Sequence, residues 1–124
     1  MNTYNKRIYG QTKNISTEEL KSKFNSSKLS YIKLAILFGS RVNGDNHSKS
    51  DYDFAVLSDN IDSTWGIEAK YWDDISSELD IFDYDLDIIN LQKAQKNILN
   101  SIKENYIILK GEDSELQRLF DTNI

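Results

Sequence analysis

Two short clusters of polar residues in this 124-residue chain have the composition and spacing of a catalytic site. Gly39-Ser40-Arg41 follows an apolar run, and Asp51-Tyr52-Asp53 opens another run, with ten residues between Ser40 and Asp51. Residues two apart in a strand point to the same face, so Asp51 and Asp53 would present their carboxylates side by side. Such a pair repels by about 4 kcal/mol at ~4 Å and an effective dielectric near 20. We therefore expect a Mg²⁺ ion between them, since this cation favours one or two carboxylates together with substrate phosphates.

The glycine-serine cluster complements a metal site of this kind. Glycine allows the backbone to approach a ligand closely, and the amides and hydroxyl that follow can donate hydrogen bonds to phosphate oxygens. Arg41 adds a fixed positive charge. We therefore predict that Gly39, Ser40 and Arg41 bind the phosphates of a nucleotide.

A third carboxylate, Asp87, lies inside a later apolar run, DLDIINL, from Asp85 to Leu91. An acid in a buried strand is costly unless it has a function, so we expect Asp87 to be buried and to serve the site. It would bind a second metal ion or take the proton from an attacking hydroxyl. Asp83 and Asp85 remain alternatives for this role, because the segment that precedes Asp87 is rich in acids.

Hydrophobic patterning predicts the elements that hold these residues. Strands are expected over Tyr31 to Phe38, Asp51 to Leu57, Asp85 to Leu91 and, at a sheet edge, Tyr106 to Leu109. Helices are expected over about Thr17 to Ser27, Trp65 to Leu79, Lys93 to Asn105 and Glu112 to Phe120. Ser16 and Glu19 form a capping box before the first helix, and Trp72 is expected on the buried face of the second. The class is α/β or α+β.

One domain over residues 1–124 is expected from the length and the lack of linkers or repeats. It would comprise an N-terminal extension with a helix (1–30), a catalytic core (31–110) and a C-terminal helix (111–124). Without cysteine there is no disulfide, thiolate metal site or cysteine nucleophile. No apolar stretch approaches the ~18 residues of a membrane span, so we expect a cytoplasmic protein. A net charge of -5 disfavours direct binding of nucleic acid.

The combined motifs resemble the nucleotidyltransferase superfamily that includes DNA polymerase β. Its signature is a Gly-Ser pair, then Asp-x-Asp or Asp-x-Glu, then a later carboxylate. The matching residues here are Gly39, Ser40, Asp51, Asp53 and Asp87. The GSR cluster, SDYDFAV from Ser50 to Val56 and LDIINL from Leu86 to Leu91 are similar to the minimal nucleotidyltransferases, and the resemblance spans about Ile32 to Lys110.

This resemblance implies a short mixed sheet with helices packed on one side, ATP as donor, and Mg²⁺, as two ions, as cofactor. Gly39 and Ser40 would bind phosphate, Asp51 and Asp53 metal, and Asp87 metal or a proton. It also implies an antitoxin that transfers AMP to a tyrosine of a helical HEPN-family toxin. Two alternatives remain: an antitoxin that neutralises its partner by binding alone, and a nucleotidyltransferase acting on a small molecule such as an antibiotic. The last usually requires an additional domain.

Overall fold

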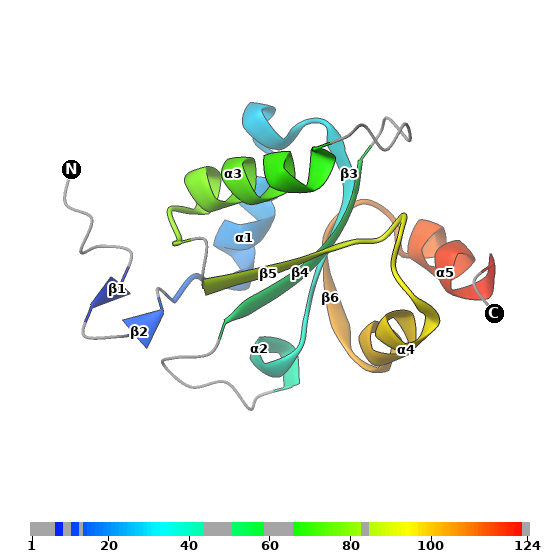
Figure 1. Ribbon diagram of the computed structural model, residues 1–124. Helices are drawn as coiled ribbons and strands as arrows, with labels where there is room; N and C mark the ends of the chain where they lie inside the picture. The colour runs from blue at the N-terminus through cyan, green and yellow to red at the C-terminus, as the bar shows by residue number, and fades with distance from the viewer. Residues whose placement is uncertain are drawn as a thin grey trace.

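A four-stranded mixed sheet forms the centre of the molecule, with strand order β5-β4-β3-β6 (Figure 1). The computed structural model describes residues 7–8, 11–12, 14–43, 51–58, 66–82 and 85–122. The sheet strands are β3 (Ile32–Phe38), β4 (Tyr52–Ser58), β5 (Leu86–Asn90) and β6 (Tyr106–Lys110). Strand β3 runs antiparallel to β4 and β6, whereas β4 and β5 are parallel. Two short strands, β1 (Arg7–Ile8) and β2 (Gln11–Thr12), form a separate antiparallel pair that the sequence did not predict. The four predicted strands are confirmed to within one residue at each end.

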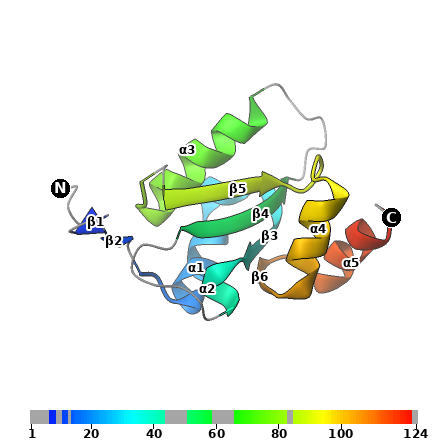
Figure 2. The ribbon, with the colours of Figure 1, turned by 60° about the horizontal axis from the view of Figure 1, so that its bottom comes forward.

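Helices cover both faces of this sheet. They are α1 (Thr17–Phe24), a short 3-10 helix η2 (Ser27–Leu29), α2 (Ser40–Asn43), α3 (Ile67–Leu79), α4 (Lys96–Glu104) and α5 (Asp113–Thr122). Helices α1 and α3 lie on one side, and α4 and α5 on the other (Figures 1 and 2). Helix α3 connects β4 to β5, which is why these two neighbouring strands are parallel. None of the helices in the described ranges has the length and apolar character needed to cross a membrane.

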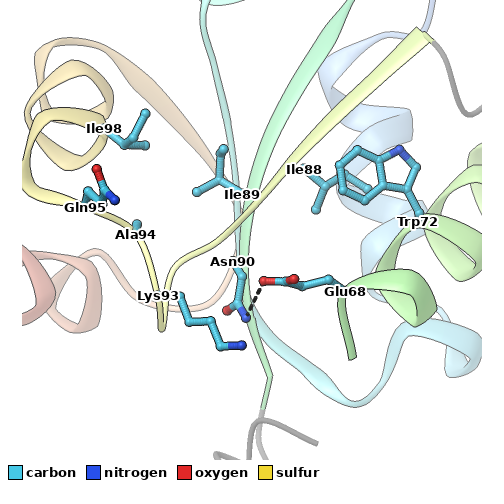
Figure 3. A pocket seen from close by; sticks show the side chains of 9 residues that line it. All are labelled: Glu68, Trp72, Ile88, Ile89, Asn90, Lys93, Ala94, Gln95 and Ile98. Atoms are coloured by element: carbon cyan, nitrogen blue, oxygen red, sulfur yellow. Dashed lines mark hydrogen bonds between the residues drawn. The ribbon is translucent and has the colours of Figure 1, made fainter. Parts of the chain in front are cut away.

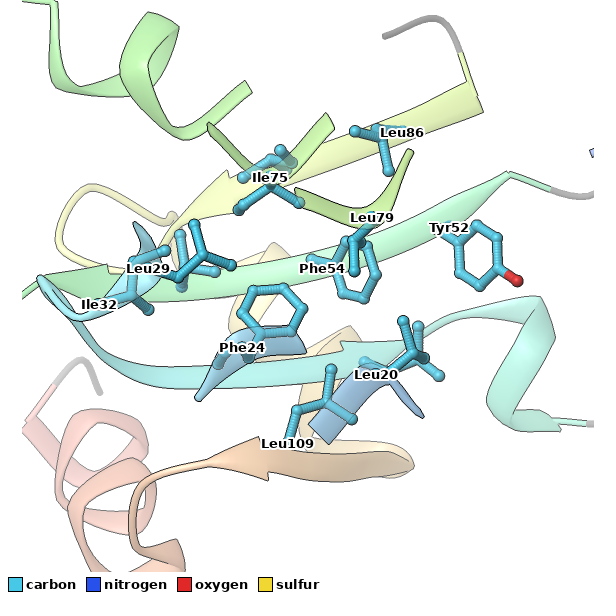
Figure 4. Packing of buried hydrophobic residues seen from close by; sticks show 14 of the residues in the cluster. Leu20, Phe24, Leu29, Ile32, Tyr52, Phe54, Ile75, Leu79, Leu86 and Leu109 are labelled. Atoms are coloured by element: carbon cyan, nitrogen blue, oxygen red, sulfur yellow. The ribbon is translucent and has the colours of Figure 1, made fainter. Parts of the chain in front are cut away.

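The two faces carry separate hydrophobic clusters, so the expectation of helices on one side was wrong, although the mixed-sheet class is confirmed. Phe24 and Phe54 belong to the cluster beneath α1 and α3 (Figure 4). Leu34 and Leu99 belong to the cluster beneath α4 and α5. The reason is visible in β3, IKLAILF, which is apolar at nearly every position and therefore requires cover on both faces.

Helix α1 begins as predicted and ends earlier. The Ser16 side chain accepts a hydrogen bond from the Glu19 backbone N–H at 3.1 Å, which confirms the cap. At the other end, the Asn25 side chain donates to the Lys21 carbonyl at 2.7 Å and satisfies the last turn. Because α1 contributes core residues such as Phe24, this part of the predicted extension belongs to the packed fold.

Helix α3 buries a different residue from the one predicted. Tyr71 is buried, whereas Trp72 is only half-buried. The Tyr71 ring stacks on Tyr31 with centroids 6.1 Å apart, and its hydroxyl donates to Ser58 Oγ at 3.0 Å. A tyrosine can bury its ring while its hydroxyl keeps a polar partner, which explains this choice. Trp65, the predicted first residue of the helix, lies outside the described residues.

Candidate active site

The turn at Gly39 connects β3 to the short helix α2 and lies against the paired acids. Gly39 has φ +83°, a left-handed conformation that residues with a side chain rarely adopt. A Cβ atom at this position would lie 2.2 Å from Asp53 Oδ2. The Gly-Ser turn and the acidic motif, separated by ten residues in sequence, are therefore in direct contact. Ser40 follows at the first position of α2 and is half-buried.

Strand register places Asp53 at the centre of the site. It pairs with Phe38 on the antiparallel side, immediately before the turn, and with Asp87 on the parallel side. Asp51 lies two residues before Asp53, so strand alternation puts it on the same face, and its side chain is exposed. Tyr52 between them is 1% exposed and packs into the hydrophobic cluster beneath α1 and α3, on the other face of the sheet. The structure therefore brings together Gly39 and all three predicted carboxylates at one end of the sheet.

Burial and negative charge both act on Asp53. Burial is the main cause that raises the pKa of Asp53, and the charges of Asp87 and then Asp51 raise it further, to about 6 from an ordinary value of 3.8. An ionised Asp53 is therefore unfavourable unless a positive charge is present. A bound cation would offset the like charges that contribute to this shift.

Asp87 occupies the predicted position, but the expectation that it is buried was wrong. Its side chain is exposed: Leu86 and Ile88 on either side of it pack beneath α1 and α3, so strand alternation directs Asp87 to the opposite face of the sheet. Asp85, the alternative third acid, is fully buried just before β5, and its charge is not among those that raise the pKa of Asp53. Asp83, the other alternative, lies outside the described residues. An exposed carboxylate beside Asp53 is the one that an incoming substrate can reach.

Arg41 makes contacts away from these carboxylates. Its guanidinium carbon lies 4.0 Å from the centroid of the Tyr52 ring, and its Nη1 donates to Asn14 Oδ1 at 3.1 Å. Tyr52 in turn accepts a hydrogen bond from the Ile15 backbone N–H at 2.8 Å. These contacts connect the segment before α1 to the start of β4. They place the Arg41 guanidinium on Tyr52, whose ring lies on the face of β4 opposite to Asp51 and Asp53.

The donor set fits a hard divalent cation such as Mg²⁺. Asp51, Asp53 and Asp87 supply only carboxylate oxygens, and Gly39 leaves open the volume that a Cβ would fill beside Asp53. Across the described residues, no three acidic or histidine side chains converge closely enough to form a complete metal site. Repulsion between ionised carboxylates favours keeping these side chains apart when no cation lies between them. The protein's own side chains would thus supply part of the coordination shell, and water and phosphate the rest.

A cavity along the outer edge of β5 was not predicted from the sequence (Figure 3). It has a volume of about 300 Å³ and lies between α3 and the start of α4. On its rim, the Asn90 side chain donates to Glu68 Oε2 at 3.4 Å. The sequence signal was the polar Asn90 in an apolar strand, since Glu68 alone reads as an ordinary solvent-facing helix residue.

Comparisons with known proteins identify the family of this chain. The family model described as polymerase beta, nucleotidyltransferase matches residues 18–115. A 33-residue segment is 52% identical to the protein adenylyltransferase MntA of Aphanizomenon flos-aquae (strain 2012/KM1/D3). That segment is 27% of this chain and only 22% of the relative.

Solved structures show the same fold at low sequence identity. A crystal structure of a toxin-antitoxin with AMP-PNP matches with a TM-score of 0.67 and 20% identity, covering 88% of this chain and 84% of the other. A structure of a tri-AMPylated Shewanella oneidensis HEPN toxin in complex with MNT antitoxin matches with a TM-score of 0.58 and 19% identity, covering 87% and 83%. The family match includes all of α1 except its first residue and every strand of the four-stranded sheet. The chain therefore belongs to the polymerase beta nucleotidyltransferase family.

Proposed function

We propose that this protein is a Mg²⁺-dependent adenylyltransferase that transfers AMP from ATP to a tyrosine of a cognate HEPN-family toxin and thereby acts as its antitoxin. The observation that carries the proposal is the contact between the Gly39 turn and Asp53, with Asp87 beside it in the sheet. This arrangement joins a phosphate-binding turn to a cation-binding carboxylate cluster. The matched relatives support the choice of reaction and partner, since their descriptions refer to adenylyl transfer, AMP-PNP and an AMPylated HEPN toxin.

Each part of the site has a role in this reaction. The Gly39 backbone and Ser40 hydroxyl would bind the triphosphate, and Asp51, Asp53 and Asp87 would hold Mg²⁺, with two ions as the expected number. When bound, Mg²⁺ neutralises the phosphate charge that develops during transfer. Arg41 would support the turn through Tyr52, and contact phosphate only after its guanidinium leaves that ring.

The acceptor chemistry requires a base that is open to solvent. The tyrosine oxygen forms a bond to the α-phosphorus, the bond from this phosphorus to the bridging oxygen breaks, and pyrophosphate leaves. A phenol has a pKa of about 10, so its proton must be removed during the attack. Asp87 is exposed beside Asp53 and would accept this proton before releasing it to water.

The competing function is neutralisation by binding alone, and the Asp51→Ala/Asp53→Ala double variant separates the two. The assay uses a HEPN-domain toxin as partner, and its ribonuclease activity is measured after incubation with antitoxin and Mg-ATP. We expect wild type to suppress this activity in an ATP-dependent manner and the double variant to lose that suppression. Equal suppression by both, with or without ATP, would refute the enzymatic function.

A further inference from the structure

The cavity beside β5 lies on the same strand as Asp87, the proposed base for the acceptor hydroxyl. It is formed by α3 on one side of the strand and by the β5–α4 connection on the other (Figure 3). Successive residues of a strand rise by about 3.3 Å, so Ile89 and Asn90 lie roughly 7 to 10 Å along β5 from Asp87. A group that fills the cavity would therefore be held close to the catalytic carboxylates.

Part of the outer backbone edge of β5 could pair with an added strand. The Leu91 N–H donates to the Val56 carbonyl at 2.9 Å, which directs Leu91 and its alternate neighbours toward β4. Ile88 and Asn90, the intervening residues, direct their backbone groups toward the outer edge. The Asn90 carbonyl accepts the Lys93 N–H at 3.0 Å, so the Ile88 N–H and C=O and the Asn90 N–H are the groups that would face a partner strand. In the described part of the chain, no other strand of the sheet pairs with β5 on this side. The edge thus has the geometry used for recognition by β-strand addition.

The side chains around the cavity define the chemistry of what fits there. Trp72, Ile89 and Ile98 give it half-buried apolar walls from three different elements. Glu68 places a carboxylate on the rim and Asp87 adds another at the near end of the strand, against one ammonium group from Lys93, so the charge around the cavity is net negative. A segment with a bulky apolar side chain and a neighbouring lysine or arginine would complement both the walls and these charges.

We propose that this groove binds the acceptor protein: an extended toxin segment pairs with the outer edge of β5 and places a bulky apolar side chain in the cavity, two to four residues from the tyrosine that is modified. This rests on the proposed function and deepens it. The anchor supplies binding energy and orientation remote from the reacting atoms, which the small exposed carboxylate site does not provide by itself. Specificity for the partner would then reside at β5 rather than at the nucleotide.

Steady-state kinetics with the HEPN-domain protein as acceptor test this proposal. Ala94→Trp fills the cavity, Glu68→Lys reverses the charge of its exposed rim, and Glu104→Lys makes the same charge change at the far end of α4. We expect both cavity variants to raise KM for the toxin about tenfold, with KM for ATP unchanged and Glu104→Lys equal to wild type. An unchanged KM for the toxin in Glu68→Lys and Ala94→Trp would overturn the proposal. So would a parallel rise in KM for ATP, which would assign the cavity to the nucleotide.

Direct binding separates this proposal from the proposed function. Toxin affinity is measured by calorimetry without ATP, and amide exchange is followed at Ile88 and Asn90. We expect Glu68→Lys to weaken binding about tenfold and toxin to slow exchange at both amides. If wild type transfers no AMP but these effects appear, the groove is the partner site and the enzymatic function fails. If transfer occurs with neither effect, the enzyme stands and the groove assignment is wrong.

Discussion

At the level of single residues, Gly39 has two separate reasons to lack a side chain: a φ of +83° and a Cβ position 2.2 Å from Asp53 Oδ2. Gly66 shares only the first, since it has φ +91° and nothing within 4 Å of its Cβ position. Gly39→Ala should therefore destabilise the fold by roughly 2–4 kcal/mol and lower AMP transfer at least about 100-fold, through displacement of Asp53. Denaturant unfolding and a transfer assay measure both.

Gly66→Ala is the matched control for this change. It should cost about 1 kcal/mol of stability, from backbone strain alone, and leave transfer by the folded protein near the wild-type level. Equal activity losses in the two variants would show that the contact between Gly39 and Asp53 has no specific importance.

Asp53 gives the stability of the ligand-free protein a distinct pH dependence. Its pKa is raised to about 6 in the folded state, chiefly by burial, against an ordinary 3.8. The folded state thus binds more protons between these values, so the free energy of unfolding falls as pH rises from about 4 to 6 and then levels off. Asp53→Asn should remove this decline and stabilise the ligand-free protein at pH 7.5 by roughly 1–2 kcal/mol, an amount reduced by partial solvent exposure.

Chemical denaturation of wild type and Asp53→Asn at pH values from 4 to 8 measures this dependence. Asp73→Asn, a change at an exposed acid of α3, is the control and should follow wild type. The difference between the two proteins isolates Asp53, because other carboxylates titrate in both. If wild type instead gains stability relative to Asp53→Asn as pH rises across this interval, Asp53 is stabilised as an anion and the pKa shift has the opposite sign.

At the level of elements, Tyr52 connects the segment before α1 to the start of β4. Its hydroxyl accepts the backbone N–H of Ile15 at 2.8 Å in a buried position. Tyr52→Phe leaves that N–H without its partner and should cost roughly 1–3 kcal/mol. Because Tyr52 faces away from Asp51 and Asp53, transfer per folded molecule should change little. Thermal unfolding and kcat are the two measurements.

Tyr106→Phe provides the comparison, since the Tyr106 hydroxyl bonds Asp113 and Gln117 at an exposed position. Water replaces exposed hydrogen bonds, so the loss should be smaller than for Tyr52→Phe. A large fall in kcat for Tyr52→Phe would show that the two faces of β4 are not independent.

The elements were largely predictable because their signals are local. The apolar run of β3 and the Ser16 cap specify their element without knowledge of the rest of the chain. Contacts between elements were less predictable. The burial of Tyr71 in place of Trp72 depends on Ser58 and Tyr31, and the exposure of Asp87 depends on how far α4 and α5 cover its face of the sheet. Within the site, the proximity of the three acids and Gly39 was predictable from their spacing in the sequence, whereas the Arg41–Tyr52 contact was not.

At the scale of the whole molecule, ligand binding should couple to folding. The acidic cluster favours a cation and its nucleotide, so Mg-ATP at about 100 times its dissociation constant should stabilise the protein by roughly 2.7 kcal/mol. A thermal melt with and without Mg-ATP measures this. Asp51→Ala/Asp53→Ala should show little shift, and ATP with excess EDTA should shift neither protein. A wild-type melt that does not respond to saturating Mg-ATP would contradict the nucleotide site.

The central claim is that the carboxylates beside Gly39 transfer AMP to the toxin, and the intact mass of the toxin tests it most directly. After incubation with wild-type protein and Mg-ATP, the toxin should gain one or more increments of about 329 Da, the mass of an AMP residue, with release of pyrophosphate. With Asp51→Ala/Asp53→Ala the toxin should gain no mass. With the control Asp73→Asn it should gain the same increments as with wild type. An unmodified toxin after incubation with folded wild-type protein and Mg-ATP would contradict this function. Equal modification by the double variant would contradict the role of the two carboxylates.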